Sequence, residues 1–171
     1  MQQVKWFQRK FDFNFEQNIF PSIVERLSGT SIRLDAKIAP ISVELLGFKP
    51  DGGWSIKENI GHLIDLEPLW QGRLEDILNG NEELRPADLE NKKTHLANHN
   101  KVEIGALLTE FRNVRQKTLD QLIKLTPEDV YKTALHPRLK TPMRTMDLFL
   151  FVAEHDDHHL ARINEIISLR P

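Results

Sequence analysis

The chain has no cysteine among its 171 residues. A disulfide framework, a thiolate metal ligand and a cysteine nucleophile are therefore excluded, and any thiol chemistry would need an external thiol. No apolar run approaches the roughly 20 residues that a transmembrane helix needs. The first residues also lack the apolar core of a signal peptide. We therefore expect no membrane association and a cytoplasmic location.

An excess of charge of one sign is also lacking. The 23 Lys and Arg residues and 25 Asp and Glu residues give a formal net charge of −2, so the composition indicates no basic surface for nucleic acid. Apolar residues make up 40% of the chain and charged residues 28%, as is usual for a globular domain. We expect no nucleic-acid partner, and a small molecule as the substrate.

Aromatic residues are concentrated at the N-terminus, where Phe11, Phe13 and Phe15 alternate with other residues. Such alternation is typical of an extended segment with one apolar side. We therefore expect an N-terminal aromatic arm over residues 1–20. In the simpler interpretation the arm packs across the rest of the chain. In the alternative it forms a dimer contact or a wall of the pocket.

From Pro21 onwards, apolar residues recur at the spacing of helices. We expect one helical domain over residues 21–171, with long helices at about 21–38, 55–80, 100–125 and 145–169. Four amphipathic helices joined by loops predict an all-α bundle. Residues 81–100 and 133–144 have no clear period, and we expect these stretches to form the entrance to a site.

Local signals mark some helix boundaries. Gly29 predicts a break in the first helix. Ser55 and Glu58 have the spacing of a capping box at the start of the second helix. Asn100, supported by Glu103, is expected to cap the third helix in the same way.

The histidines carry the main functional signal, because three of seven fall in the stretch His155-Asp-Asp-His158-His159. On a helix, His155 and His159 would share one face, with Cβ atoms about 5–6 Å apart. His62, within the apolar pattern of the second helix, is the best third candidate. Three neutral imidazoles with an open position are typical of catalytic zinc, whereas structural sites are closed by four protein ligands. We therefore predict a metal site formed by His62, His155 and His159.

The remaining histidines have simpler interpretations. His158 competes with His159, but the apolar stripe continues through His159. We therefore expect His158 on the helix flank, facing solvent or lying behind the ligands. His95 and His99 are also four residues apart, but they precede the predicted start of the third helix. We interpret them as residues of a polar loop.

The carboxylates near these histidines, among them Asp156, are most simply interpreted as parts of solvated helix faces. One or two of them are expected to orient a metal-bound imidazole through its other nitrogen. Asp65, one turn after His62, is the first choice for this role, and Glu58, one turn before it, is the second.

Two motifs together resemble the DinB/YfiT-like metalloprotein superfamily. The first is Trp54-Ser-Ile-Lys-Glu58 followed by His62-Leu63, and the second runs from Ala153 to Leu160 around the three histidines. The resemblance spans residues 21–169. It implies a four-helix up-down-down-up bundle whose metal ligands correspond to His62, His155 and His159. It also implies zinc or nickel as the single divalent ion, and in some members a homodimer.

One departure from the family pattern concerns the residues after His159. Many relatives continue with Arg-Gly-Gln, whereas this chain has Leu160-Ala161-Arg162. We expect Arg162, one turn after His159, to face the pocket.

The resemblance implies a metal-dependent enzyme, either a hydrolase or a transferase that uses an external low-molecular-weight thiol. It assigns no catalytic residue in this chain. The alternatives are a helical protein that binds a metal or ligand without turnover, and a purely structural bundle.

Overall fold

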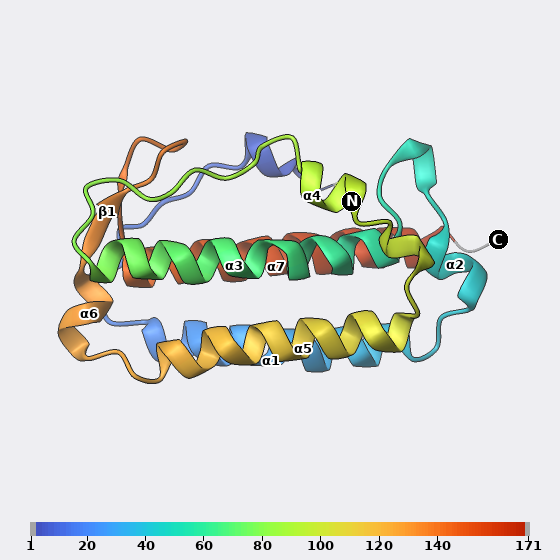
Figure 1. Ribbon diagram of the computed structural model, residues 1–171, viewed down its shortest axis with the longest axis horizontal. Helices are drawn as coiled ribbons and strands as arrows, with labels where there is room; N and C mark the ends of the chain where they lie inside the picture. The colour runs from blue at the N-terminus through green and yellow to red at the C-terminus, as the bar shows by residue number, and fades with distance from the viewer. Residues whose placement is uncertain (1–2, 170–171) are drawn as a thin grey trace.

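The computed structural model describes residues 3–169 and arranges four long helices in a bundle (Figure 1). These helices are α1 (Phe20–Ile38), α3 (Ile56–Leu78), α5 (Ile104–Leu122) and α7 (Thr145–Ser168). Figure 1 shows that α1 and α7 run in one direction along the bundle and that α3 and α5 run in the other. The expected up-down-down-up arrangement is confirmed. No helix among the described residues is both long enough and apolar enough to cross a membrane.

Short elements lie before α1 and in the connections between the long helices. They are η1 (Trp6–Gln8), α2 (Val43–Gly47), η2 (Pro50–Gly52), α4 (Lys92–Leu96), η3 (His99–Lys101), α6 (Pro127–Tyr131), β1 (Thr133–Leu135) and β2 (Pro142–Arg144). The two strands form an antiparallel hairpin with Thr133 opposite Arg144. The segment between α3 and α5 runs back along the bundle (Figure 1), and the amide of Leu84 in it donates to the carbonyl of Leu135 at 2.9 Å.

The predicted break at Gly29 is wrong, because α1 continues through it to Ile38. A glycine inside a helix costs about 1 kcal/mol relative to alanine. Leu27 and Leu34, on either side of Gly29, are both fully buried, and burying each such side chain contributes about 1.5–3 kcal/mol. Tertiary packing therefore outweighs the local preference of the glycine.

The predicted start of the third helix at Asn100 is also wrong. Helix α5 starts at Ile104, with Glu103 at the N-cap. The Asn100 amide oxygen instead accepts a hydrogen bond from the hydroxyl of Ser55 at 2.7 Å, so Asn100 ties the loop to the start of α3. The capping box of Ser55 and Glu58 is present as expected.

The N-terminal arm packs on α7. Trp6 contacts the ring of Phe151 at a centroid distance of 4.9 Å, and the guanidinium of Arg9 donates to the carboxylate of Glu154 at 2.5 Å. Trp6 and Phe7 also lie in the wall of a pocket. The arm therefore packs across the bundle and also forms part of the pocket wall.

A buried ionic network joins the four long helices at the centre of the bundle. Arg115 on α5 donates to Glu67 on α3 at 2.6 Å and to Asp156 on α7 at 2.5 Å. Thr30 on α1 donates to the same Asp156 carboxylate at 2.9 Å. Thr118 donates its hydroxyl proton to Glu67. The expectation that Asp156 lies on a solvated face is wrong, because Asp156 is fully buried.

The charges of this network depend on one another. Burial raises the pKa of Glu67 despite its contact with Arg115. Burial also opposes the charge of Arg115, but the nearby carboxylates of Asp156 and Glu67 outweigh it, so the pKa of Arg115 is raised. Arg115 is therefore the cation that makes two buried carboxylates tolerable in the core.

Replacing Arg115 by methionine should strongly destabilise the fold, because the two carboxylates would lose their buried cation. We expect the free energy of unfolding in urea to fall by about 3–5 kcal/mol. Arg112→Met on the same helix is the matched control, because Arg112 pairs with Asp35 at the surface and such pairs contribute about 1 kcal/mol or less. Similar losses in the two variants would contradict the central role of Arg115.

Candidate metal centre

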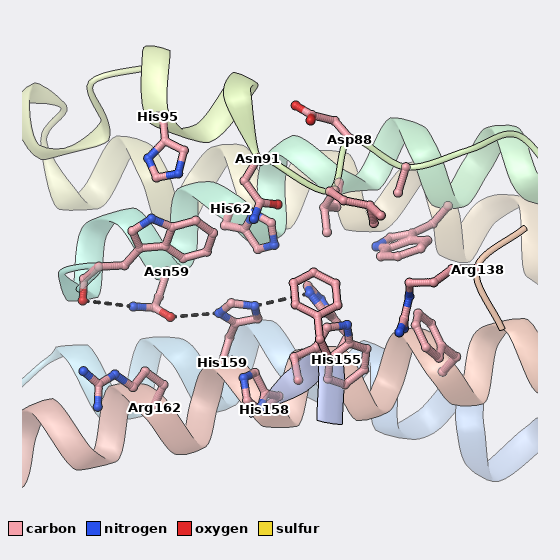
Figure 2. Close-up of a pocket in the computed structure, with 18 of the residues that line it drawn as sticks. Asn59, His62, Asp88, Asn91, His95, Arg138, His155, His158, His159 and Arg162 are labelled. Atoms are coloured by element: carbon pink, nitrogen blue, oxygen red, sulfur yellow. Dashed lines mark hydrogen bonds between the residues drawn. The ribbon is translucent and has the colours of Figure 1, made fainter. Parts of the chain in front are cut away.

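Three imidazoles from two helices converge between α3 and α7 (Figure 2). His62 lies on α3, and His155 and His159 lie one turn apart on α7. Each contributes one ring nitrogen to a group whose members all lie within 4.8 Å of one another. All three residues are buried. The structure thus brings together the residues that the sequence analysis selected, and His158 is not in this group.

The tautomer of His159 is set by Asn59. The Asn59 amide nitrogen donates to the backbone carbonyl of Ser55 at 2.8 Å, so its amide oxygen faces Nδ1 of His159 at 2.8 Å. An amide oxygen can only accept, so Nδ1 of His159 carries the proton. The lone pair of His159 is therefore on Nε2, the atom that points toward His155 (Figure 2).

The tautomer of His62 is set by Thr94. The hydroxyl of Thr94 donates to the Asp65 carboxylate at 2.9 Å, so its oxygen accepts from Nδ1 of His62 at 3.0 Å. The lone pair of His62 is thus also on Nε2. Asp65 therefore acts on His62 through Thr94, whereas we expected Asp65 to contact the His62 ring directly.

The same Asp65 carboxylate faces Nε2 of His99 at 2.9 Å. His99 is 7% exposed, so its interpretation as a polar loop residue is wrong. Gly61 makes this packing possible, because a Cβ atom at that position would collide with the His99 ring. His95 is exposed but lies in the pocket wall, with its ring 5.8 Å from that of Trp54.

The three imidazoles are held in their neutral form. Burial lowers the pKa of His62 to about 4. Burial first, and the neighbouring histidines second, hold the pKa values of His155 and His159 well below 6.5. Nε2 of His155 lies 3.2 Å from Nε2 of His159. Neutral imidazole is the form that binds a metal ion.

The cluster opens onto a cavity of about 640 Å³, within the usual range for small-molecule sites. Its walls come from the arm, both helices and the two stretches expected at the entrance. All three tryptophans, Trp6, Trp54 and Trp70, are in the wall. Trp54 packs directly on His62 at a centroid distance of 4.6 Å.

Of the other residues considered in the sequence analysis, His158 and Arg162 line the pocket. His158 is half-buried, and Arg162 forms an ion pair with Glu165 at 2.8 Å. Glu58 stays in its capping box and pairs with Lys49 at 2.5 Å. It is not among the described residues that line the pocket.

The sequence matches the DinB superfamily model over residues 26–163, so the chain belongs to the DinB superfamily. One similar solved structure is YfiT from Bacillus subtilis, described as a probable metal-dependent hydrolase with an unusual four-helix bundle topology. It shares 21% identity with a TM-score of 0.79, over 94% of this chain and 92% of YfiT.

A second similar structure is the colibactin self-resistance protein ClbS, solved in complex with double-stranded DNA. It shares 12% identity with a TM-score of 0.72, over 92% of this chain and 100% of ClbS. None of the curated proteins matches the sequence. At these identities the two structures establish the likeness of the fold alone.

The low imidazole pKa values predict the sign of a pH effect on the metal-free protein. Below about pH 6.5 these histidines bind protons in the unfolded chain but stay neutral in the folded protein. The free energy of unfolding therefore falls as the pH is lowered toward 4. His62 alone corresponds to about 2 kcal/mol lost by pH 5. Urea unfolding in EDTA between pH 7.5 and pH 5 measures this loss. His62→Gln should give a shallower profile, and an unchanged slope would contradict the assignment.

Proposed function

We propose that this protein is a metal-dependent enzyme, a hydrolase of a small molecule, with His62, His155 and His159 as the metal ligands. The observation that carries the proposal is the convergence of three neutral imidazoles beside an open pocket. Structural metal sites are closed by four protein ligands, and catalytic sites keep one position for water or substrate. Among the described residues, the cluster contains three such ligands.

The donor set fits a divalent ion. Asn59 and Thr94 leave the lone pairs of His159 and His62 on Nε2, so these two imidazoles have outer partners of the kind that metal-bound histidines use. Nδ1 of His155 is buried and has no such partner among the described residues. Imidazole suits zinc, nickel, copper and iron. We propose zinc as the first choice and nickel as the second. Such an ion supplies Lewis-acid chemistry, because it polarises a carbonyl or phosphoryl oxygen and lowers the pKa of water to about 7.

The residues of this chain provide binding and shielding around the reacting group. The aromatic rings of Trp6, Trp54 and Trp70 form much of the pocket wall and suit an apolar part of a small substrate. Asp88, His95 and His158 also reach the pocket, and they are the titratable groups from which a proton carrier can be sought. The net charge of −2 favours a small molecule over nucleic acid. A cytoplasmic location and a homodimer are part of the proposal as well.

Metal analysis of untagged protein tests the ligand set. Wild-type protein should retain about one equivalent of zinc after gel filtration, because three imidazoles converge on one point. His62→Ala, His155→Ala and His159→Ala should each bind zinc at least tenfold more weakly. His158→Ala and His95→Ala are the controls and should retain wild-type affinity. Full metal content in His62→Ala would overturn the assignment.

Cobalt substitution tests whether the site is open and which chemistry it supports. Small carboxylates should change the visible spectrum of the cobalt-loaded protein, because an open position can exchange its ligand. A strong thiolate-to-cobalt band would favour an S-transferase that uses an external thiol. A spectrum indifferent to every added ligand would indicate a closed, non-catalytic site.

A further inference from the structure

One end of the pocket lies toward the C-terminal end of α3, beyond His62. It is lined by Arg73, His136 and Arg138. We call these three residues the donor end. None of them takes part in the proposed metal site. Arg73 is three helical turns from His62, about 16 Å along the helix at 1.5 Å per residue. Figure 2 shows Arg138 on the far side of His155 from Arg162.

Arg73 is a buried cation with an unused donor. Its side chain is 1% exposed, and its Nε donates to the carbonyl of Arg85 at 3.0 Å. Its Nη1 lies 3.1 Å from Nε2 of His136. Its Nη2 is buried and has no hydrogen-bond partner among the described residues. Leaving a buried donor without a partner is unfavourable, so a site lined by one favours an incoming acceptor.

Arg138 repeats this pattern from the connection between β1 and β2. Its guanidinium lies over the ring of Phe7 at 5.3 Å. Its Nη2 is likewise buried without a hydrogen-bond partner among the described residues. Two arginines from distant parts of the chain therefore line one end of the pocket, and each has a buried Nη2 without a hydrogen-bond partner among the described residues.

His136 adds to the surplus of donors. Its Nδ1 faces the backbone amides of Arg138 and Leu139, each at 3.2 Å, while its Nε2 faces Arg73. A neutral imidazole has one ring nitrogen that can accept a hydrogen bond. His136 can therefore accept from the backbone amides or from Arg73, but not from both. Burial, and then the charge of Arg73, lower the pKa of His136 to about 4, so the ring is neutral at pH 7.

The nearby carboxylates are engaged elsewhere. Asp76 accepts from Arg85 at 2.8 and 3.0 Å and from Asn81 at 3.2 Å. The Asp88 carboxylate accepts hydrogen bonds from the backbone amides of Glu90 and Lys92. Within residues 3–169, neither Arg73 nor Arg138 forms an ion pair. The donor end therefore carries positive charge without a matching protein anion.

An aromatic layer separates the donor end from the histidine cluster. The Trp70 ring lies 5.8 Å from that of His155, and the Arg73 guanidinium lies 5.6 Å from Trp70. The centroid of the Phe151 ring lies 5.5 Å from that of the His136 ring. One molecule with an apolar middle could reach both ends of the pocket.

We propose that the donor end binds an oxyanion group, a carboxylate or a phosphate, carried by the molecule on which the histidine site acts. Arginine pairs with both groups through parallel hydrogen bonds. The substrate is then a small acid with an apolar spacer between its anionic group and its reacting bond. This inference rests on the proposed function for the reacting bond, but binding of the anion itself requires no metal.

Three probes with one shared frame test the inference on the full chain in EDTA. They are phenylacetate, benzylphosphonate and the uncharged phenylacetamide. Because all three tryptophans line the pocket, fluorescence titration reports binding, and calorimetry checks it. At least one anionic probe should bind at least tenfold more tightly than the amide. The tighter of the two anions assigns the site to carboxylate or to phosphate.

Matched variants locate the anion. Arg138→Met and Arg73→Met should each weaken binding of the anionic probe at least tenfold, and Arg138→Lys should recover part of it because the charge is kept. Arg162→Met, at the other end of the pocket, should stay within twofold of the wild type. Arg138 lies in a surface connection, so its variant tests the inference even if Arg73→Met fails to fold.

Other outcomes separate this inference from the proposed metal function. Equal affinity for the amide and the anions, no binding of either anion, or loss of binding in Arg162→Met alone would overturn the donor end as an anion site. His62→Ala should bind the anionic probe as the wild type does. A His62→Ala variant that loses zinc and keeps the anion supports both proposals, whereas wild-type protein that binds the anion but no zinc would leave only the anion site.

Discussion

The bundle depends on a single buried cation. Arg115 contacts carboxylates on α3 and α7 and the carbonyl of Leu27 on α1, so one side chain of α5 reaches the other three long helices. Its partner Asp156 directly follows His155 in α7, and its partner Glu67 lies on α3 beyond His62. The two helices that carry the imidazoles are therefore held to the same guanidinium. A register shift of either helix would break this network and separate the imidazoles.

The imidazoles are oriented from two independent directions. Asn59, on α3, reaches across to His159 on α7. Thr94, on α4 in the long crossover, contacts His62 and links it to Asp65. The crossover that makes the up-down-down-up topology possible thus also supplies a support of the site. Both supports leave Nε2 free, so the fold prepares the donor atoms that a metal ion needs.

The sequence predicts the parts of this arrangement that depend on helical spacing. The i, i+4 pair of His155 and His159, the capped helix that carries His62, and the bundle itself all follow from local patterns. The burial of Asp156 does not, because its partner Arg115 is 41 residues away in the sequence. Thr94 in the crossover likewise acquires its role only through long-range packing.

The donor end also could not be read from the sequence, since the arginines that form it lie on α3 and in the hairpin connection and share no motif. Crystals of zinc-loaded protein, measured at the zinc absorption edge, test the central claim most directly. One anomalous peak should lie about 2.0–2.1 Å from Nε2 of His62, His155 and His159. The fourth coordination position of this zinc ion should face the pocket. A peak at any other site, or one closed by a fourth protein ligand, would contradict an open three-histidine centre.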